Sequence, residues 1–192
     1  MTWMASAMHA AQAQLETATH NLANVTSDGF RRVRSSLEMT DRGLVARESP
    51  TFAQGGIRET GRRFDLALLG PGAFSVGGGT TRDGAFVRDR AGFLVDATGR
   101  RLRGEHGPLR VSSEASIASD GTVTDGDRRV DRLPLPPGTT VRSGALEASN
   151  VDAIGESLAI LTAQRSFETA QKTFVAIDET RDKAVNDVGR LK

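Results

Sequence analysis

The sequence predicts an α+β fold, with long N- and C-terminal helices pairing as a coiled coil and a central Gly-rich antiparallel β domain between them in the chain. Two observations lead to this prediction. All six prolines and all but two of the 21 glycines lie within residues 28–145. Both chain ends carry apolar residues at helical spacing. We therefore divide the chain into an N-terminal coiled-coil helix (1–27), a connector (28–65), a central β domain (66–145) and a C-terminal coiled-coil helix (146–192).

The N-terminal segment carries a narrow apolar stripe. Its members alternate between spacings of four and three residues: Met4, Met8, Ala11, Leu15, Ala18, Leu22 and Val25. This alternation keeps the stripe on one helix face, as in a helix that packs along another helix. Asn24 and the run Ser27-Asp28-Gly29 follow. Because Gly29 can adopt the left-handed conformation, we expect the helix to end there.

The central segment is typical of short strands joined by tight turns. Apolar and β-branched runs at 64–69, 73–76, 85–87 and 93–95 are the strand candidates. Asp83-Gly84, Thr98-Gly99 and Asp120-Gly121 lie where turns between strands are needed. The segment is therefore predicted to form a small antiparallel β domain.

The C-terminal segment predicts a helix over residues 151–189, roughly 58 Å long at 1.5 Å per residue. Its stripe extends back to Ile160 and comprises Ala163, Phe167, Ala170, Phe174, Ile177, Ala184, Val188 and Leu191. Val151, Ile154, Leu158 and Leu161 are slightly out of phase, and we expect them to widen the same apolar face. Ser149 and Asp152 resemble a capping box at the helix start. A helix of this length needs a partner helix, in the same chain or in another subunit.

The composition argues against several classes of function. Lys and Arg total 25 against 24 Asp and Glu, so the chain lacks the basic excess of a nucleic-acid-binding protein. It has no cysteine, which rules out a disulfide scaffold, a thiolate zinc site and a cysteine nucleophile. No paired catalytic motif appears, so we expect no enzyme activity, no cofactor, no metal and no small-molecule substrate. We also expect no cleaved signal peptide, because no apolar leader segment is visible.

Five separated motifs resemble those of the flagellar basal-body rod protein family, which includes rod and hook axial proteins. Residues 21–31, Asn-Leu-Ala-Asn-Val-Thr-Ser-Asp-Gly-Phe-Arg, are similar to the family's N-terminal signature. Residues 144–152 and 163–168 resemble its C-terminal signature and continuation. Residues 65–74, and the pair 81–86 with 96–99, are similar to its internal segments. The internal motifs are most like those of the longer proximal-rod or distal-rod proteins.

This resemblance implies a structural subunit that assembles helically into the axial drive shaft of the bacterial flagellum and serves motility. The implied position is the proximal rod near its junction with the distal rod, or the distal rod, in the part of the basal body that spans the periplasm. The implied partners are further copies of the chain, other rod and hook proteins, and the flagellar type III apparatus that exports the subunits unfolded.

The resemblance also implies which residues serve folding and assembly. Asn24 and Gly29 would end the first helix, Phe30 would anchor the outgoing chain, and Ser149 and Asn150 would start the last helix. Gln164, Arg165 and Phe167 would offer subunit contacts. The complete set is Asn21, Leu22, Ala23, Asn24, Gly29, Phe30, Leu146, Glu147, Ser149, Asn150, Val151, Gln164, Arg165, Phe167 and Phe174.

Three alternatives belong to other classes. One is an enzyme on a small β domain, such as a peptidoglycan-cutting rod accessory, which would need a paired carboxylate or an activated nucleophile. The second is a DNA-binding protein, which the net charge of +1 disfavours. The third is a rod-associated accessory or coiled-coil adaptor, which would share the helices and would not be built into the rod.

Overall fold

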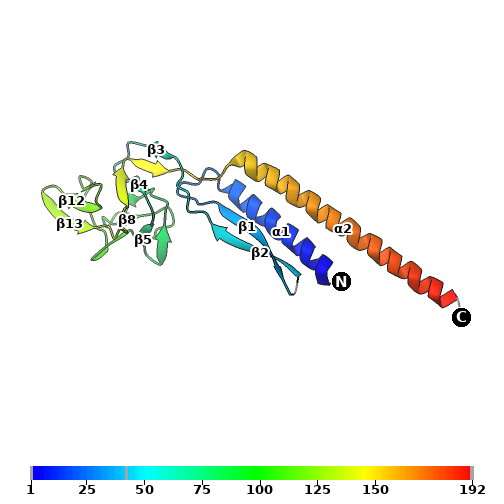
Figure 1. Ribbon diagram of the computed structural model, residues 1–192. Helices are drawn as coiled ribbons and strands as arrows, with labels where there is room; N and C mark the ends of the chain where they lie inside the picture. Colours follow the sequence, from blue (N-terminus) through cyan, green and yellow to red (C-terminus); the bar gives the residue numbers. More distant parts are fainter. Residues whose placement is uncertain (1, 42, 191–192) are drawn as a thin grey trace. The chain divides into compact units, whose positions relative to one another are not determined.

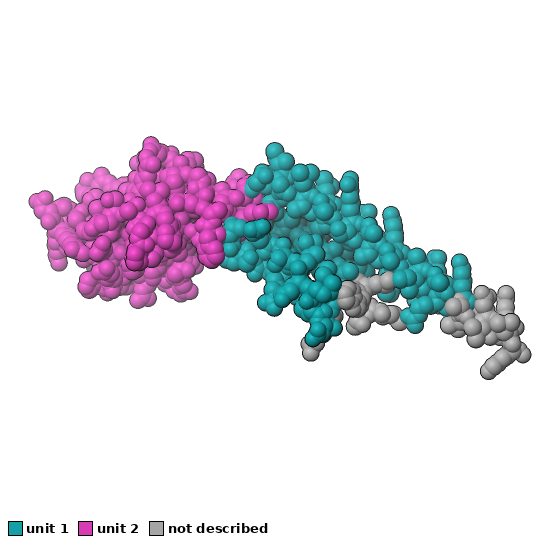
Figure 2. Space-filling model, in the orientation of Figure 1, with its two compact units in different colours: residues 1–23, 33–51, 152–192 teal, residues 24–32, 52–151 magenta. Residues whose placement is uncertain are grey.

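The computed structural model describes the backbone of residues 2–41 and 43–190, and the side chains of 5–41 and 43–183. Met4, Ala184, Val188 and Leu191 of the two predicted stripes therefore lie outside the described side chains. The chain forms two compact units, coloured separately in Figure 2. Unit 1 contains residues 1–23, 33–51 and 152–192, and unit 2 contains residues 24–32 and 52–151.

Unit 1 consists of two helices and one hairpin. Helix α1 spans Thr2–Ala23 and helix α2 spans Ala153–Arg190, while strands β1 (Val33–Thr40) and β2 (Gly43–Pro50) pair antiparallel. α1 contacts both α2 and the hairpin, as Figure 1 shows. The approach to β2 is close, because a Cβ added at Gly43 would lie 2.4 Å from the Ser6 hydroxyl oxygen. The Thr17 hydroxyl also hydrogen-bonds the Glu48 carboxylate across this contact.

The predicted coiled coil of long terminal helices is wrong. α1 has 22 residues and α2 has 38, which correspond to about 33 Å and about 57 Å. α1 therefore accompanies α2 over only part of its length, and it shares its own surface with the hairpin. Along the predicted stripe of α2, Ala163 is buried, whereas Phe174 and Ile177 remain 37% and 43% exposed. A continuous seam between two long helices would have buried both.

A second correction concerns the early turns of α2. Ile154, Leu158 and Leu161 were expected to widen the packed face, but they are 74%, 59% and 51% exposed. Ala163, which is 3% exposed, follows Ile154 by nine residues, about two and a half turns, and so lies on the opposite face. These three exposed residues form a row on one face of α2, which we call the outer stripe.

The start of α2 also differs from the expectation. Asp152, rather than Ser149, caps the helix, because its Oδ1 accepts a hydrogen bond of 3.1 Å from the Ile154 amide. The Ser149 hydroxyl accepts from the Val151 amide at 3.3 Å, within the turn that precedes the helix. The capping box therefore marks the right region, and the observed cap, Asp152, lies three residues beyond the predicted cap.

Unit 2 is a set of short antiparallel strands. They are β3 (Ile57–Glu59), β4 (Leu66–Leu69), β5 (Phe74–Val76), β6 (Gly79–Thr81), β7 (Val87–Arg88), β8 (Leu94–Val95), β9 (Arg103–Gly104), β10 (Gly107–Pro108), β11 (Ser116–Ile117), β12 (Thr122–Asp125), β13 (Arg128–Arg132), β14 (Thr140–Ser143) and β15 (Ala145–Glu147). Consecutive strands pair as hairpins, except that β4 pairs with β14 and β3 with β15. These two long-range pairs join the start of the unit to its end.

The core of unit 2 is apolar and continuous. Leu66, Leu68, Phe74, Leu94 and Leu102 are among its fully buried side chains. The four predicted strand runs overlap β4, β5, β7 and β8. The many short antiparallel strands agree with the predicted Gly-rich β region. Strands β1 and β2, in the segment interpreted as a connector, were not predicted.

Candidate assembly site

Unit 2 brings residues of the two family-like signatures together. The Gly29 amide donates to the Glu147 carbonyl at 2.6 Å, and the Asn150 amide donates to the Phe30 carbonyl at 3.4 Å. The Asn150 side chain continues this pairing, because its Oδ1 accepts from the Arg32 amide at 2.6 Å. Its Nδ2 donates to the Ala53 carbonyl at 2.6 Å. Residues 29–32 therefore run beside residues 147–150, and we call this arrangement the signature junction.

A buried ion pair lies beneath the signature junction. Arg82 donates from Nε and Nη2 to the Glu147 carboxylate at 2.9 and 2.5 Å. Its Nη1 also donates to the carbonyls of Gly70 and Gly72, both at 2.9 Å. The two side chains are only 5% and 2% exposed. Because buried charges are tolerated only when paired and hydrogen-bonded, Arg82 and Glu147 are structurally interdependent.

Gly29 fits the junction because it has no side chain. Its φ is +70°, in the left-handed region that disfavours residues with a Cβ. An added Cβ would lie 2.3 Å from both the Arg82 carbonyl carbon and the Asp83 amide nitrogen. The glycine of the N-terminal signature thus lets the outgoing chain approach the backbone next to the buried arginine.

We predict that Gly29→Ala destabilises unit 2 by about 1–3 kcal/mol more than Gly126→Ala does. Gly126 is a matched control, because its φ is +61° and an added Cβ there meets nothing within 4 Å. The control carries only the conformational cost of about 1–2 kcal/mol. Urea unfolding of both variants measures the difference. Equal costs would show that Gly29 is needed for its backbone conformation alone.

Asn21, from the same N-terminal signature, acts within unit 1. Its Oδ1 accepts from the Val33 amide at 2.8 Å, and its Nδ2 donates to the Val33 carbonyl at 2.7 Å. The same Nδ2 reaches the Glu156 carboxylate of α2 at 3.2 Å. Asn21 and Glu156 are 1% and 2% exposed. One buried amide therefore ties α1 to both the start of β1 and the first turn of α2.

The remaining candidate residues fall into two groups. Leu146 is buried on β15, and Asn24, Ser149 and Val151 are half-buried in unit 2. Unit 1 holds the others: half-buried Leu22 and Phe167, and exposed Ala23, Gln164, Arg165 and Phe174. The two signatures thus meet in unit 2, and the continuation on α2 belongs to a helix surface.

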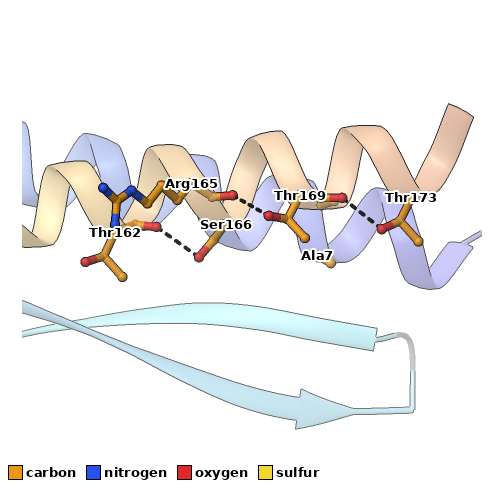
Figure 3. Close-up of a pocket in the computed structure, with 7 residues that line it drawn as sticks. Ala7, Thr162, Arg165, Ser166, Thr169 and Thr173 are labelled. Carbon is orange, nitrogen blue, oxygen red and sulfur yellow. Dashed lines mark hydrogen bonds between the residues drawn. The ribbon is translucent and has the colours of Figure 1, made fainter.

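A hollow of ≈ 550 Å³ lies beside α2 in unit 1 and is lined by Ala7, Thr162, Arg165, Ser166, Thr169, Ala170 and Thr173. Figure 3 draws these residues as sticks. Its hydroxyl groups are already engaged. Ser166 donates to the Thr162 carbonyl at 3.0 Å, and Thr173 donates to the Thr169 carbonyl at 2.8 Å. The hollow therefore presents methyl groups and the Arg165 side chain rather than a row of free hydroxyl groups.

Two buried residues of these sites, Arg82 and Glu156, were not predicted. Arg82 lies inside the motif at 81–86, but nothing in the local sequence indicates a partner 65 residues away. Within the described part of the chain, no group of three or more His, Asp or Glu side chains is arranged to hold a metal ion. Neither helix, over its described residues, is long and apolar enough to cross a membrane.

Comparison with known proteins agrees with the motifs. A family model described as "Flagellar basal body rod FlgEFG protein C-terminal" matches residues 142–187, which include β15 and most of α2. The chain is 27% identical over 228 residues to the flagellar basal-body rod protein FlgF of Caulobacter vibrioides, covering 93% of each chain. It is 26% identical over 245 residues to the flagellar basal-body rod protein FlgG of Agrobacterium fabrum, covering 91% of this chain and 94% of the relative.

A shorter match links the chain to a hook protein. The flagellar hook protein FlgE of Brucella abortus is 36% identical over 115 residues, covering 52% of this chain and 29% of that protein. The two longer alignments exceed the 192 residues of the chain, so the relatives carry residues that this chain lacks. These matches confirm the family resemblance that the motifs indicate.

Proposed function

We propose that this chain, a relative of the flagellar basal-body rod proteins, is a structural subunit that assembles helically into the rod of the bacterial flagellum. Its proposed position is the proximal rod near the distal-rod junction, or the distal rod, and swimming motility depends on it. The observation that carries the proposal is the family match over residues 142–187, since this range includes the exposed outer stripe of α2.

The outer stripe supports a role in assembly. Ile154, Leu158 and Leu161 lie one helical turn apart on a face that α1 leaves uncovered. A row of large apolar side chains on one exposed face is typical of a protein–protein contact. A growing rod needs heterologous contacts, in which one patch meets a different patch on the next subunit. We assign the outer stripe to such a contact.

The other face of α2 offers a second contact. Phe167 and Phe174 are half-buried and 37% exposed respectively, so α1 covers them only in part. We propose that they pack against helices of adjacent subunits. The partners in this account are further copies of the chain and other axial proteins, delivered through the flagellar type III export apparatus without cleavage of a signal peptide.

Deleting the gene from its own cells tests the proposed function. The deletion should abolish swimming and leave basal bodies without a complete rod, and a plasmid copy should restore both. Electron microscopy of isolated basal bodies provides the structural readout. Motile deletion cells with complete rods would refute the proposal.

We predict that Phe174→Ala raises the protein concentration needed for polymerisation. Burial of a large apolar side chain contributes roughly 1.5–3 kcal/mol, and the loss recurs at every subunit. The circular dichroism of the monomer should hardly change, because Phe174 is partly exposed already. Sedimentation across a concentration series measures the threshold. If the variant polymerises at the same concentration as the wild type, Phe174 is not part of the contact between subunits.

A further inference from the structure

Unit 2 contains a cavity beside the signature junction that the proposed helix contacts do not use. Its volume is ≈ 480 Å³, and it is lined by Arg31, Phe52, Gln54, Gly70, Pro71 and Gly72. Arg31 follows Phe30 in the N-terminal signature, so the outgoing chain places a cation in this cavity. The cavity is therefore tied to a motif of the family, although assembly through α2 gives it no role.

The polar groups of the cavity wall are already engaged. The Gly70 and Gly72 carbonyls accept from Arg82, and the Pro71 carbonyl accepts from the Thr139 hydroxyl. Gln54 spans the edge of β4, because its Oε1 accepts from the Gly70 amide at 3.3 Å and its Nε2 donates to the Leu68 carbonyl at 2.6 Å. The wall is thus held by its own hydrogen bonds and is preformed for a ligand.

Arg31 differs from its surroundings because one of its donors is unsatisfied. Its Nε is buried and has no hydrogen-bond partner among the described residues. Burial, followed by the charge of Arg82, lowers the pKa of Arg31, and the charge of Glu147 opposes that effect. Glu147 is itself engaged by Arg82. The two arginines and one glutamate leave one positive charge without a paired anion, and a buried unsatisfied donor is costly.

An exposed aromatic side chain completes the cavity. Phe52 lines it and is 84% exposed, the largest value among the exposed apolar side chains of the described residues. A cation inside and an apolar ring at the rim are complementary to an acidic side chain with an apolar neighbour. Arginine recognises carboxylates well, because its planar fork can donate two parallel hydrogen bonds.

We propose that this cavity is a docking pocket for an Asp or Glu side chain on a neighbouring axial subunit, with an adjacent apolar residue of that subunit packing on Phe52. The carboxylate accepts from the guanidinium group of Arg31 and neutralises the unpaired charge. The identity of the neighbour as an axial subunit rests on the proposed function, whereas the carboxylate specificity rests on the pocket alone.

Binding of a blocked tripeptide to the full-length chain tests the pocket. The probe is acetyl-Leu-Glu-Leu-amide, and the matched control is acetyl-Leu-Gln-Leu-amide, which has the same shape and no charge. We expect the glutamate peptide to shift the Arg31 side-chain Nε–H signal saturably in an NMR titration. We expect the glutamine peptide to bind at least about ten-fold more weakly, since hydrogen bonds to charged groups exceed neutral ones by such a margin.

Variants separate the pocket from general charge effects. Arg31→Gln and Phe52→Ala should each weaken binding of the glutamate peptide, whereas Arg90→Gln, at an exposed arginine outside the cavity lining, should not. Phe52→Ala removes an exposed side chain, so it keeps the test valid if Arg31→Gln affects folding. Any of three results would overturn the proposal. The two peptides could bind equally well, both pocket variants could bind the glutamate peptide as tightly as the wild type, or equimolar inorganic phosphate could displace the peptide. If the chain is found in basal bodies but does not bind the glutamate peptide, the pocket proposal is wrong and the proposed function still stands.

Discussion

Glu147→Ala should lower the free energy of unfolding of unit 2 by about 3–5 kcal/mol, the usual cost of removing one partner of a buried ion pair. The variant leaves the Arg82 guanidinium buried without its anion. It also removes the acceptor of the Gly55 amide, which donates to Glu147 Oε1 at 3.2 Å. We expect the signature junction to open as well, since Gly29 pairs with the backbone of the same residue.

Glu59→Ala is the matched control for this experiment. Glu59 forms an ion pair with Arg142, but these side chains are 71% and 50% exposed. An exposed pair contributes only about 0–1 kcal/mol. Native-state hydrogen exchange at the β4 amides measures both variants. A cost for Glu147→Ala no larger than that of Glu59→Ala would contradict the structural role of the buried pair.

The double variant Arg82→Met/Glu147→Leu extends the test. In many proteins an apolar replacement of a buried ion pair is neutral or stabilising. Here Arg82 also binds the carbonyls of Leu68, Gly70 and Gly72. We therefore expect the double variant to remain less stable than the wild type, because these acceptors lose their donor. Full recovery of stability would mean that the carbonyl contacts contribute little.

Leu158→Asp should block assembly of the rod while leaving the monomer intact. Leu158 is 59% exposed in the monomer, so the expected change in the free energy of unfolding is within about 0.5 kcal/mol. In the proposed subunit contact the same position is buried. There a carboxylate loses its hydration without gaining a partner, which costs several kcal/mol. Cells that carry only the variant should not swim.

Val87→Asp is the corresponding control, because Val87 is 53% exposed and lies on a short strand of unit 2, away from α2 in sequence. We expect cells that carry this variant as their only copy to swim. Urea unfolding of both purified proteins establishes that each is folded. Swimming cells with Leu158→Asp as the only copy would exclude the outer stripe from the essential contacts.

The helices were predictable because their signals are local. The stripe with Ala11 and Ala18 corresponds to α1, but the helix ends at Ala23, six residues before the predicted stop at Gly29. Heptad spacing, however, does not specify how far a partner extends. α1 ends while α2 continues, so Phe174 and Ile177 stay exposed instead of completing a coiled coil. The sequence also did not predict that the outer stripe faces away from α1, because residue spacing alone does not indicate which face of a helix contacts its partner.

The hairpin and the buried pair were not predictable because they depend on tertiary contacts. In strands β1 and β2, Leu37 and Met39 are exposed. Because neither face of the hairpin buries its apolar residues consistently, the sequence lacks the alternation of apolar and polar residues that would indicate a strand. Contacts of Ser6 and Thr17 with β2 hold the hairpin in unit 1. The family-like signatures, by contrast, were informative about neighbours in space. Gly29 and Glu147 come from opposite ends of the chain and pair directly.

The most direct test of the central claim, that this chain is a rod subunit held through the outer stripe of α2, is a single-thiol experiment in purified basal bodies. The chain has no cysteine, so Leu158→Cys introduces its only thiol. The account predicts that the variant is present in basal bodies and that its thiol is shielded from a bulky maleimide there and reactive in the dilute monomer. It also predicts that a maleimide–benzophenone reagent attached to this thiol before assembly, whose ketone inserts into C–H bonds on illumination, joins the variant to another axial subunit. Absence of the chain from basal bodies, or equal reactivity of the thiol in both states, would contradict the account.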